Sequence, residues 1–351
     1  MRLLDRVARL QSPFVVEFLN HQLEIPRAAL LSAAVMQSYL RYVLADDVTS
    51  LCGQIALHST DFLLAAIDLV RLPASVIWIE WNDAPYRRML IDLGVIDPTE
   101  THERKRTGMC VFNDADGRRG RIVSCWEFPE ARERIEINPF ELQFDLDRGD
   151  YRESAERTRQ QTGLWTPKAA QLSDVLGHAR FELDAPYAPL LKRYATAERF
   201  HSVCGPAVAR GAFDFPLAWA FLLMLAAPNA LNIAASDLSR LNASRRRQKK
   251  TDLLSHLEVR SVIGAHLERE RAHGFGGERA APRMHFVRGH LVRRKDKIFW
   301  RNGHVRGRPE KGAIYSRTAV LRLQEVAGPP KKSAVKRTLL KKAPSDQNDP
   351  E

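Results

Sequence analysis

The sequence predicts an α+β protein in which a helical body with a small embedded β-sheet is followed by a basic β-rich module and a disordered tail. Helical apolar spacing near both ends of residues 1–240 predicts the body. β-Branched and aromatic runs between residues 74 and 146 predict the sheet. The charge then changes sign. Residues 240–342 hold 28 Lys and Arg against 8 Asp and Glu, a net of +20, while the rest of the chain carries −8. This reversal predicts a module that meets an anionic partner.

The composition is that of an ordinary globular protein. Of the 351 residues, 44% are hydrophobic and 27% are charged, so the chain can bury a core without disulfides or metals. None of the four cysteines forms a Cys-x-x-Cys pair, which argues against a cysteine zinc site. Cys110 and Cys125 flank a turn-rich run, and we expect them to be reduced core residues near each other on a hairpin.

Neither a signal peptide nor a membrane span is expected. The first residues are charged and no apolar segment follows them. The most apolar run, 215–227, has roughly 13 residues, whereas a bilayer needs about 20. The expected location is therefore the cytoplasm of the host cell, without membrane contact.

Helices are predicted on both sides of the sheet. Residues 26–43 place apolar side chains at three-to-four spacing, and 62–72 form a segment that Pro73 ends. Further helices are predicted at 186–200, 206–227 and 229–241. The segment 206–227 is apolar nearly all round, so we expect it to be a central core helix.

Strands are predicted by β-branched and aromatic runs. Those of the body are 76–81, 109–112, 121–128, 134–137 and 141–146, and the second and third flank the turn 114–117. The module 241–327 adds candidates at 257–263, 285–294, 297–306 and 314–323. The tail, 328–351, has lysines among small polar residues and no apolar periodicity, so we expect disorder.

The joint before the module is one candidate contact surface. Five of the six residues 245–250 are cations, and they cannot all lie on one helix face. Crowded cations repel each other unless counter-charges are supplied, and phosphates supply them. A solvated linker is the alternative. The predicted phosphate contacts in this joint are Arg245, Arg246, Arg247, Lys249 and Lys250.

A basic hairpin is the second candidate surface. Val287-Arg288-Gly289-His290 mirrors His304-Val305-Arg306-Gly307, which predicts one hairpin with the tip Lys295-Asp296-Lys297. A three-residue loop places Arg288 opposite His304 and His290 opposite Asn302, so that the arginines and histidines share a face with Trp300. A change of register by one residue would separate them. The predicted contacts are Arg288, His290, Arg293, Arg294, Lys295, Trp300, Arg301, His304 and Arg306.

Two alternatives remain for this hairpin. Trp300 can pack in the core, with the histidines in local hydrogen bonds, instead of stacking on a base. His290 and His304 can act as general base and general acid in metal-independent RNA cleavage, with Arg288 stabilising the developing charge. No carboxylate cluster accompanies the histidines, so no metal is predicted, and no cofactor motif occurs.

Glu80 lies in a run that is apolar on both faces. Such a carboxylate needs a partner, and we expect an arginine from elsewhere in the fold. A catalytic carboxylate is the alternative, and Asp145 and Asp147 could join it in a metal site, although their spacing is not diagnostic.

Three pieces of the sequence resemble a family of uncharacterised proteins from tailed phages and prophages of proteobacteria. They are Trp78-Ile79-Glu80-Trp81, Leu241-Asn242-x-x-Arg245 ahead of Leu253-Leu254-Ser255, and the mirrored Arg-Gly-His and His-Val-Arg-Gly pieces around 288 and 306. Together they cover about a tenth of the chain. The last also resembles the C-terminal part of hypothetical proteins of other bacteria and mobile elements. In that family a proline often stands immediately before Leu253 of this chain, where this sequence has Asp252. The resemblance implies a phage or prophage setting and no mechanism.

The leading functional prediction is therefore binding of DNA or RNA, largely through the phosphate backbone. A ribonuclease is the runner-up, and a factor that docks an acidic host protein is the third hypothesis. A small-molecule ligand is not expected.

Overall fold

A computed structural model describes residues 2–10, 13–18, 21–96, 104–129, 135–148, 175–189, 197–227, 229–262, 285–287, 290–294, 297–301 and 304–306. The chain divides into two compact units, one made of residues 1–265 and 289–301, the other of residues 266–288 and 302–351. The predicted module 241–327 is therefore divided between the two units. The predicted tail, 328–351, lies outside the described residues, as do the strand candidate 314–323 and Arg288 and Lys295.

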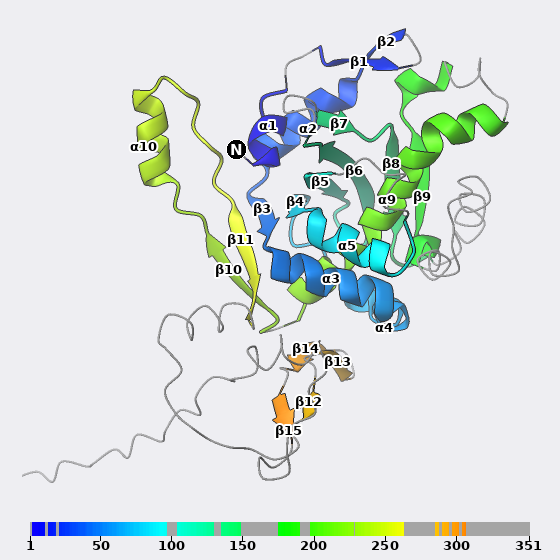
Figure 1. Cartoon of the computed structure of the whole chain (residues 1–351), viewed down its shortest axis with the longest axis vertical. Coiled ribbons are helices and arrows are strands. Elements are labelled where there is room, and N and C mark those ends of the chain that lie inside the picture. The colour runs from blue at the N-terminus through cyan, green and yellow to red at the C-terminus, as the bar shows by residue number, and fades with distance from the viewer. Residues whose placement is uncertain are drawn as a thin grey trace, which may run out of the picture. The chain divides into compact units, whose positions relative to one another are not determined.

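The protein is a mixed α+β fold built on a large sheet (Figure 1). Nine of the described strands join it in the order β10-β11-β3-β4-β5-β6-β8-β9, with β7 also paired to β6. Strands β11, β3 and β4 run parallel, and the other neighbours are antiparallel. The bounds are β3 Leu40–Leu44, β4 Val76–Asn82, β5 Arg106–Asn113, β6 Arg119–Glu127, β7 Ile135–Ile137, β8 Phe140–Asp145, β9 Ala179–Leu183, β10 Leu231–Ala235 and β11 Leu257–Ser261.

The expectation of a small sheet inside a helical body was wrong. The sheet begins at Leu40 and ends at Ser261, and it includes two segments predicted as helix, around 40–44 and 231–235. The predicted helix 26–43 ends at Gln37, and Ser38 has the extended backbone angles φ −63° and ψ 130°. Local spacing cannot reveal β3, because its ladder partners β4 and β11 lie far away in sequence.

Helices cover both faces of the sheet. On one face α1 (Leu3–Val7) and α2 (Pro26–Gln37) pack against Val43, Trp78, Cys110 and Cys125. The sheet side chains that alternate with these four residues along the strands point to the other face. They pack against α3 (Asp46–His58), α4 (Thr60–Ala65), α5 (Ala84–Asp92) and α9 (Ala197–Leu225). The remaining described elements are β1 (Val15–Phe18), β2 (His21–Glu24) and the short 3-10 turns η1 (Ile67–Leu69), η2 (Leu176–His178) and η3 (Ala185–Tyr187).

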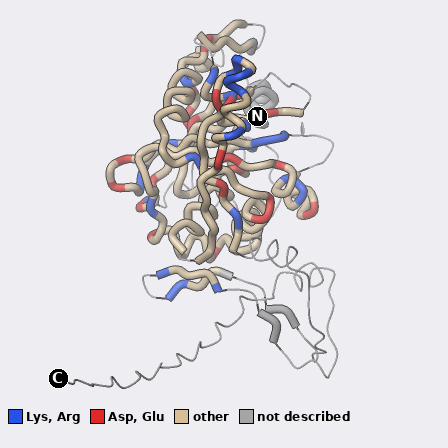
Figure 2. Tube along the Cα trace, turned by 90° about the vertical axis from the view of Figure 1, so that its left-hand side faces the viewer, with Lys and Arg blue, Asp and Glu red and all other residues tan. Residues whose placement is uncertain are grey.

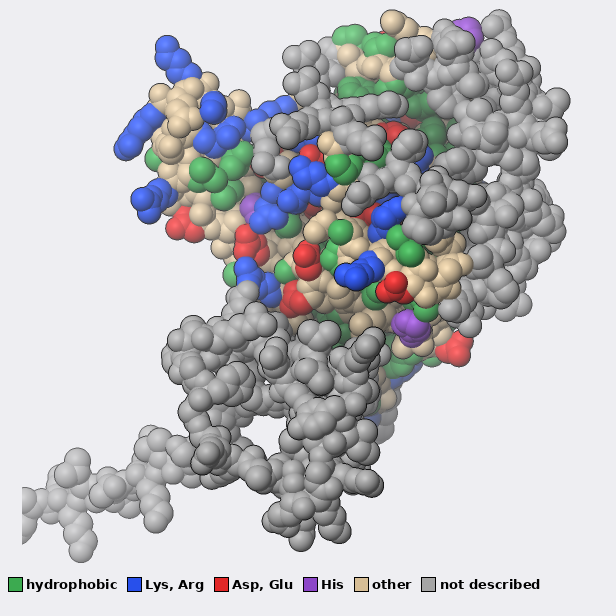
Figure 3. Space-filling model, viewed as in Figure 1, with side chains coloured by type: hydrophobic (Ala, Val, Ile, Leu, Met, Phe, Trp, Pro, Cys, Tyr) green, Lys and Arg blue, Asp and Glu red, His purple; other side chains and the backbone are tan. Residues whose placement is uncertain are grey.

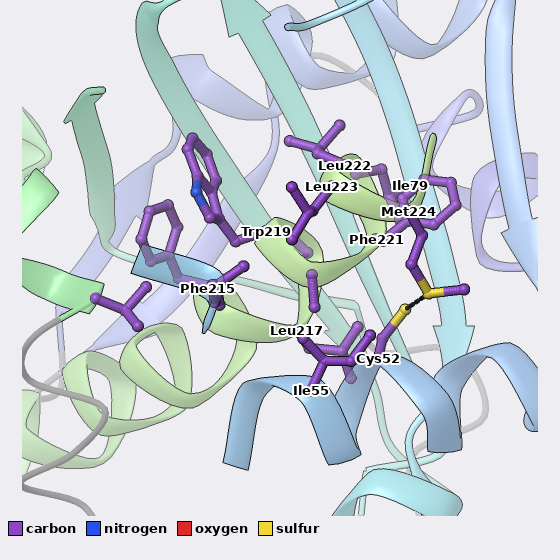
Figure 4. Close-up of a cluster of buried hydrophobic side chains, with 14 of the residues drawn as sticks. Cys52, Ile55, Ile79, Phe215, Leu217, Trp219, Phe221, Leu222, Leu223 and Met224 are labelled. Carbon is purple, nitrogen blue, oxygen red and sulfur yellow. Dashed lines mark hydrogen bonds between the residues drawn. The ribbon is translucent and has the colours of Figure 1, made fainter. Parts of the chain in front are cut away.

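Helix α9 supplies the largest part of the core. It has 29 residues, begins at Ala197 before the predicted start at 206, and passes through Pro206 and Pro216. Phe215, Trp219 and Phe221 are fully buried, and the Cys52 thiol lies 3.6 Å from the sulfur of Met224 (Figure 4). The segment Ala207–Leu225 is long and apolar enough to cross a membrane, but 89% of it is buried inside the fold, as in a core helix.

The cysteines of the sheet are core residues. Cys110 lies opposite Val123 and Cys125 opposite Gly108, so both thiols are on one face, and both are buried and free. Burial raises the pKa of both thiols. The expectation of reduced, neighbouring core cysteines is confirmed.

Two short ladders follow the large sheet along the chain. β13 (His290–Arg294) pairs with β14 (Lys297–Arg301) in the first unit. β12 (His285–Val287) pairs with β15 (His304–Arg306) in the second.

Candidate nucleic-acid interface

A basic arm extends from the edge of the large sheet. It consists of the edge strand β10, the helix α10 (Ser239–Arg247) and the segment that returns to β11 (Figure 1). Asp237 starts the helix by accepting hydrogen bonds from the backbone N–H and the hydroxyl of Ser239. No residue of α10 is buried, so the helix is held by its ends and by the return segment.

The helix ends in a Schellman motif. Lys249 N–H donates to the carbonyl of Arg246 and Lys250 N–H to the carbonyl of Arg245, both at 2.9 Å. Lys249 has φ +55°, a left-handed conformation in which glycine or asparagine is usual. The motif turns the chain sharply and leaves both lysines exposed at the helix end.

The return segment is bonded to the helix and to the body. The Asn242 amide donates to the Leu253 carbonyl and accepts from the Leu253 N–H, and Arg245 Nε donates to the Thr251 carbonyl at 2.8 Å. Leu254 N–H donates to Asp5 of α1 at 2.8 Å. The guanidinium groups of Arg9 and Arg41 donate to the carbonyls of Thr251, Asp252 and Ser255.

Most cations of the arm have no acidic partner among the described residues. Arg246 forms an ion pair with Asp252, and Lys250 donates to Gln248. No ion pair with a described carboxylate joins Arg240, Arg247 or Lys249. Blue side chains therefore surround α10 on the surface (Figure 3). These cations are exposed and fixed in position by a folded element.

The hairpin β13–β14 has a register that differs from the predicted one. His290 pairs with Arg301 and Arg294 with Lys297, so two residues connect the strands instead of three. In the second unit, Val287 pairs with His304 and His285 with Arg306. The predicted pairs Arg288–His304 and His290–Asn302 are therefore wrong by one residue. The shared face of arginines and histidines, on which the ribonuclease hypothesis depended, does not follow from this register.

One face of β13–β14 is bound to the body. Leu291, Ile298 and Trp300 are at most 8% exposed and belong to the core of the first unit. Arg293 forms two hydrogen bonds to the Asp68 carboxylate, at 2.9 and 2.8 Å, and also donates to the Ala65 carbonyl. Trp300, predicted as a nucleic-acid contact, packs in the core, which was the alternative for this residue. Arg293, also predicted as a contact, holds the hairpin to Asp68.

The opposite face is exposed and basic. Along β14 the exposed residues Lys297, Phe299 and Arg301 alternate with the buried Ile298 and Trp300. Arg294 lies opposite Lys297 on this face, and Phe299 is 38% exposed. Figure 2 marks Lys and Arg in blue along the chain trace. Among the described residues, none pairs with Arg294, Lys297 or Arg301 in an ion pair. The prediction missed Phe299 because the register was one residue off; the alternation in 297–301 is the signal that identifies it.

Glu80 pairs with an arginine, as predicted. Its carboxylate is fully buried, lies 2.8 Å from Arg106 and accepts the backbone N–H groups of Leu3 and Leu4 at 3.0 and 2.8 Å. Asp147 pairs with Arg118 instead of joining Glu80. In the described part of the chain, no group of three potential ligands could hold a metal ion. Glu80 therefore fixes α1, whose Asp5 in turn holds the arm.

A second buried charge network was not predicted. Arg104 lies between Asp83, at 2.9 Å, and Asp214 of α9, at 2.8 Å, and the Trp126 indole also donates to Asp214. Burial raises the pKa of Asp214, while the two carboxylates raise that of Arg104. No periodicity marks Arg104, which precedes β5, so sequence spacing carried no signal for this contact. The network joins α9 to the end of β4.

Comparisons with models of protein families, with curated proteins and with solved structures found no match to this chain.

Proposed function

We propose that this protein binds nucleic acid mainly through the phosphate backbone, with the α10 arm as the principal contact. The observation that carries the proposal is the set of exposed cations on α10 and its C-terminal turn that have no acidic partner among the described residues. Each cation that meets a phosphate releases a condensed counterion, so an array of this kind favours a polyanion over an isolated charge.

The geometry of the arm adds support. The Schellman turn, the Asn242 amide and the bonds to α1 fix the backbone that carries the cations, so less backbone entropy is lost when phosphates bind. Lysine at a left-handed position is less favourable than glycine, which is consistent with selection for its charge. The proposed setting is a phage or prophage, and the proposed location is the bacterial cytoplasm.

The test is binding of the full chain to labelled DNA and RNA across a salt series. The triple variant Arg247→Ala, Lys249→Ala and Lys250→Ala removes three arm cations. The control variant Arg88→Ala, Arg119→Ala and Arg180→Ala removes three exposed cations from α5, β6 and β9. We expect the arm variant to lower the slope of log affinity against log salt by about 2 to 3, and the control to change it little.

Two results would overturn the proposal. One is the absence of binding to either polynucleotide at low ionic strength. The other is an equal loss in both triple variants, because net charge alone would then explain the affinity. A host-protein factor, the alternative function, predicts a complex that survives competitor DNA. No observation among the described residues favours the ribonuclease.

A further inference from the structure

We infer that the exposed face of the β13–β14 hairpin is a base-stacking platform for single-stranded nucleic acid. This inference rests on the proposed function and names the form of its ligand. The residues that carry it are Phe299 at the centre, with Arg294, Lys297 and Arg301 around it.

The platform is rigid because its other face is part of the core. Leu291, Ile298 and Trp300 anchor both strands, and Arg293 binds the Asp68 carboxylate through two nitrogens. A ring on such a surface is positioned before the ligand arrives, so little entropy is lost when a base stacks on it. A free two-stranded hairpin would be only marginally stable, which makes this anchoring necessary.

The exposed face places an aromatic ring between cations. Phe299 lies between Lys297 and Arg301 on one strand and opposite Val292 on the other. Side chains two residues apart on a strand are separated by about 6.8 Å, twice the rise per residue. This spacing is similar to the phosphate repeat of an extended single strand. Lys297 and Arg301 are four residues apart, about 13.6 Å along the strand, so their long side chains can meet phosphates on either side of a nucleotide whose base stacks on Phe299.

The exposed phenylalanine is the reason for choosing a single strand. In a duplex both faces of a base are covered by its neighbours, so a protein ring can stack only on an unpaired or splayed base. Phe299 also remains exposed although the neighbouring Ile298 and Trp300 are buried in the core. Stacking tolerates any base, which fits a surface whose other members are cations rather than base-reading amides.

The experiment compares the affinity of the full chain for a 12-nucleotide oligo-dT and for a 12-base-pair duplex by fluorescence anisotropy. Three variants are used: Phe299→Ala, Phe299→Trp and, as the control, Leu30→Ala. Leu30 is 38% exposed, as Phe299 is, and lies on α2, outside the arm and the hairpin. Circular dichroism and thermal melting confirm that each variant is folded.

We expect the unmodified chain to prefer the single strand. Phe299→Ala should lower that affinity on the order of 5- to 150-fold, the range for loss of one stacked base, while duplex affinity stays unchanged. Phe299→Trp should retain or raise the single-strand affinity, and Leu30→Ala should change neither affinity.

The inference is overturned if Phe299→Ala leaves single-strand affinity unchanged, if it lowers both affinities equally, or if the duplex binds more tightly. The last result would fit a two-stranded ribbon in the major groove. In all three cases the proposed function survives, because the arm variant tests it separately. If the unmodified chain binds neither the single strand nor the duplex, both the inference and the proposed function are overturned.

Discussion

The side-chain amide of Asn242 brackets the peptide of Leu253, accepting from its N–H at 2.8 Å and donating to its carbonyl at 3.0 Å. This pair joins the helix α10 to the segment that returns to β11. It closes the return segment onto α10 and so fixes the spacing of the arm's cations. The relationship explains why an asparagine precedes the basic run by a few residues.

Replacing Asn242 should loosen the arm without changing its charge. In Asn242→Ala two hydrogen bonds are lost, each worth about 0.5–1.5 kcal/mol, and the affinity for nucleic acid should fall several-fold. Hydrogen exchange should speed up in 248–256 while the global melting temperature changes little. Asn232→Ala, on the exposed strand β10, is the control. An unchanged exchange rate in Asn242→Ala would show that the bracket does not hold the arm.

Asp252 limits the charge of the arm. Its hydrogen bond from Arg246 holds the pKa of the carboxyl below its ordinary value of 3.8, so it is ionised at neutral pH. Asp252→Asn frees Arg246 and should tighten binding, with the salt slope steeper by about 1. Asp237→Asn adds the same charge at the other end of α10 but frees no arginine. Equal gains in both variants would indicate a net-charge effect.

Substitutions at Lys249 distinguish the effect of backbone strain from the effect of charge. Lys249→Gly and Lys249→Ala both remove the cation and should lower the affinity equally, with a salt slope smaller by about 1. Only glycine relieves the left-handed conformation, which costs a non-glycine residue about 1 kcal/mol. We therefore expect hydrogen exchange in the C-terminal turn of α10 to be slower in Lys249→Gly than in Lys249→Ala. Equal exchange would contradict the positive φ angle.

Trp300 and Phe299 test the hairpin register. Trp300→Ala removes a buried indole and should destabilise the docked hairpin by about 3–5 kcal/mol. Phe299→Ala removes a partly exposed ring and should cost about 1 kcal/mol or less. Denaturation, with hydrogen exchange of β13 and β14, measures both. The reverse order would restore the predicted register, in which Trp300 faces outward.

Glu80 should be a major determinant of stability. Glu80→Gln leaves the half-buried Arg106 without its nearest carboxylate and presents an amide to the N–H groups of α1. Breaking a buried pair in this way costs about 3–5 kcal/mol, which urea unfolding would measure. The control is Glu258→Gln, whose carboxylate pairs with Arg2 and is 39% exposed; a surface pair is worth about 1 kcal/mol or less. A similar cost in both variants would refute the central role of Glu80.

Local patterns predicted several elements of the fold correctly. The β-branched run around Ile77 and Ile79 is a central strand, and the turn signal before Gly117 closes the β5–β6 hairpin. These predictions hold because strand propensity and turn chemistry depend on neighbouring residues. The predicted arginine partner of Glu80 also holds, because a buried carboxylate requires one wherever it lies.

Other predictions required information that neighbouring residues do not carry. β3 and β10 form by pairing with β11, and no local signal distinguishes them from helix. The hairpin register was missed because a two-residue and a three-residue loop are both compatible with the mirrored flanks. That single residue exchanged Phe299 for Trp300 as the exposed ring of the hairpin.

The sequence by itself determined the mixed α+β character, the apolar core helix and the concentration of cations after residue 240, because composition, periodicity and charge are properties of the chain. The tertiary structure decided the extent of the sheet, the return of β11 between β10 and β3, and which cations keep an acidic partner. The physical reason is that ladder pairing and ion pairing are long-range choices among competing partners. These partners are selected when the chain packs and water is excluded from the core.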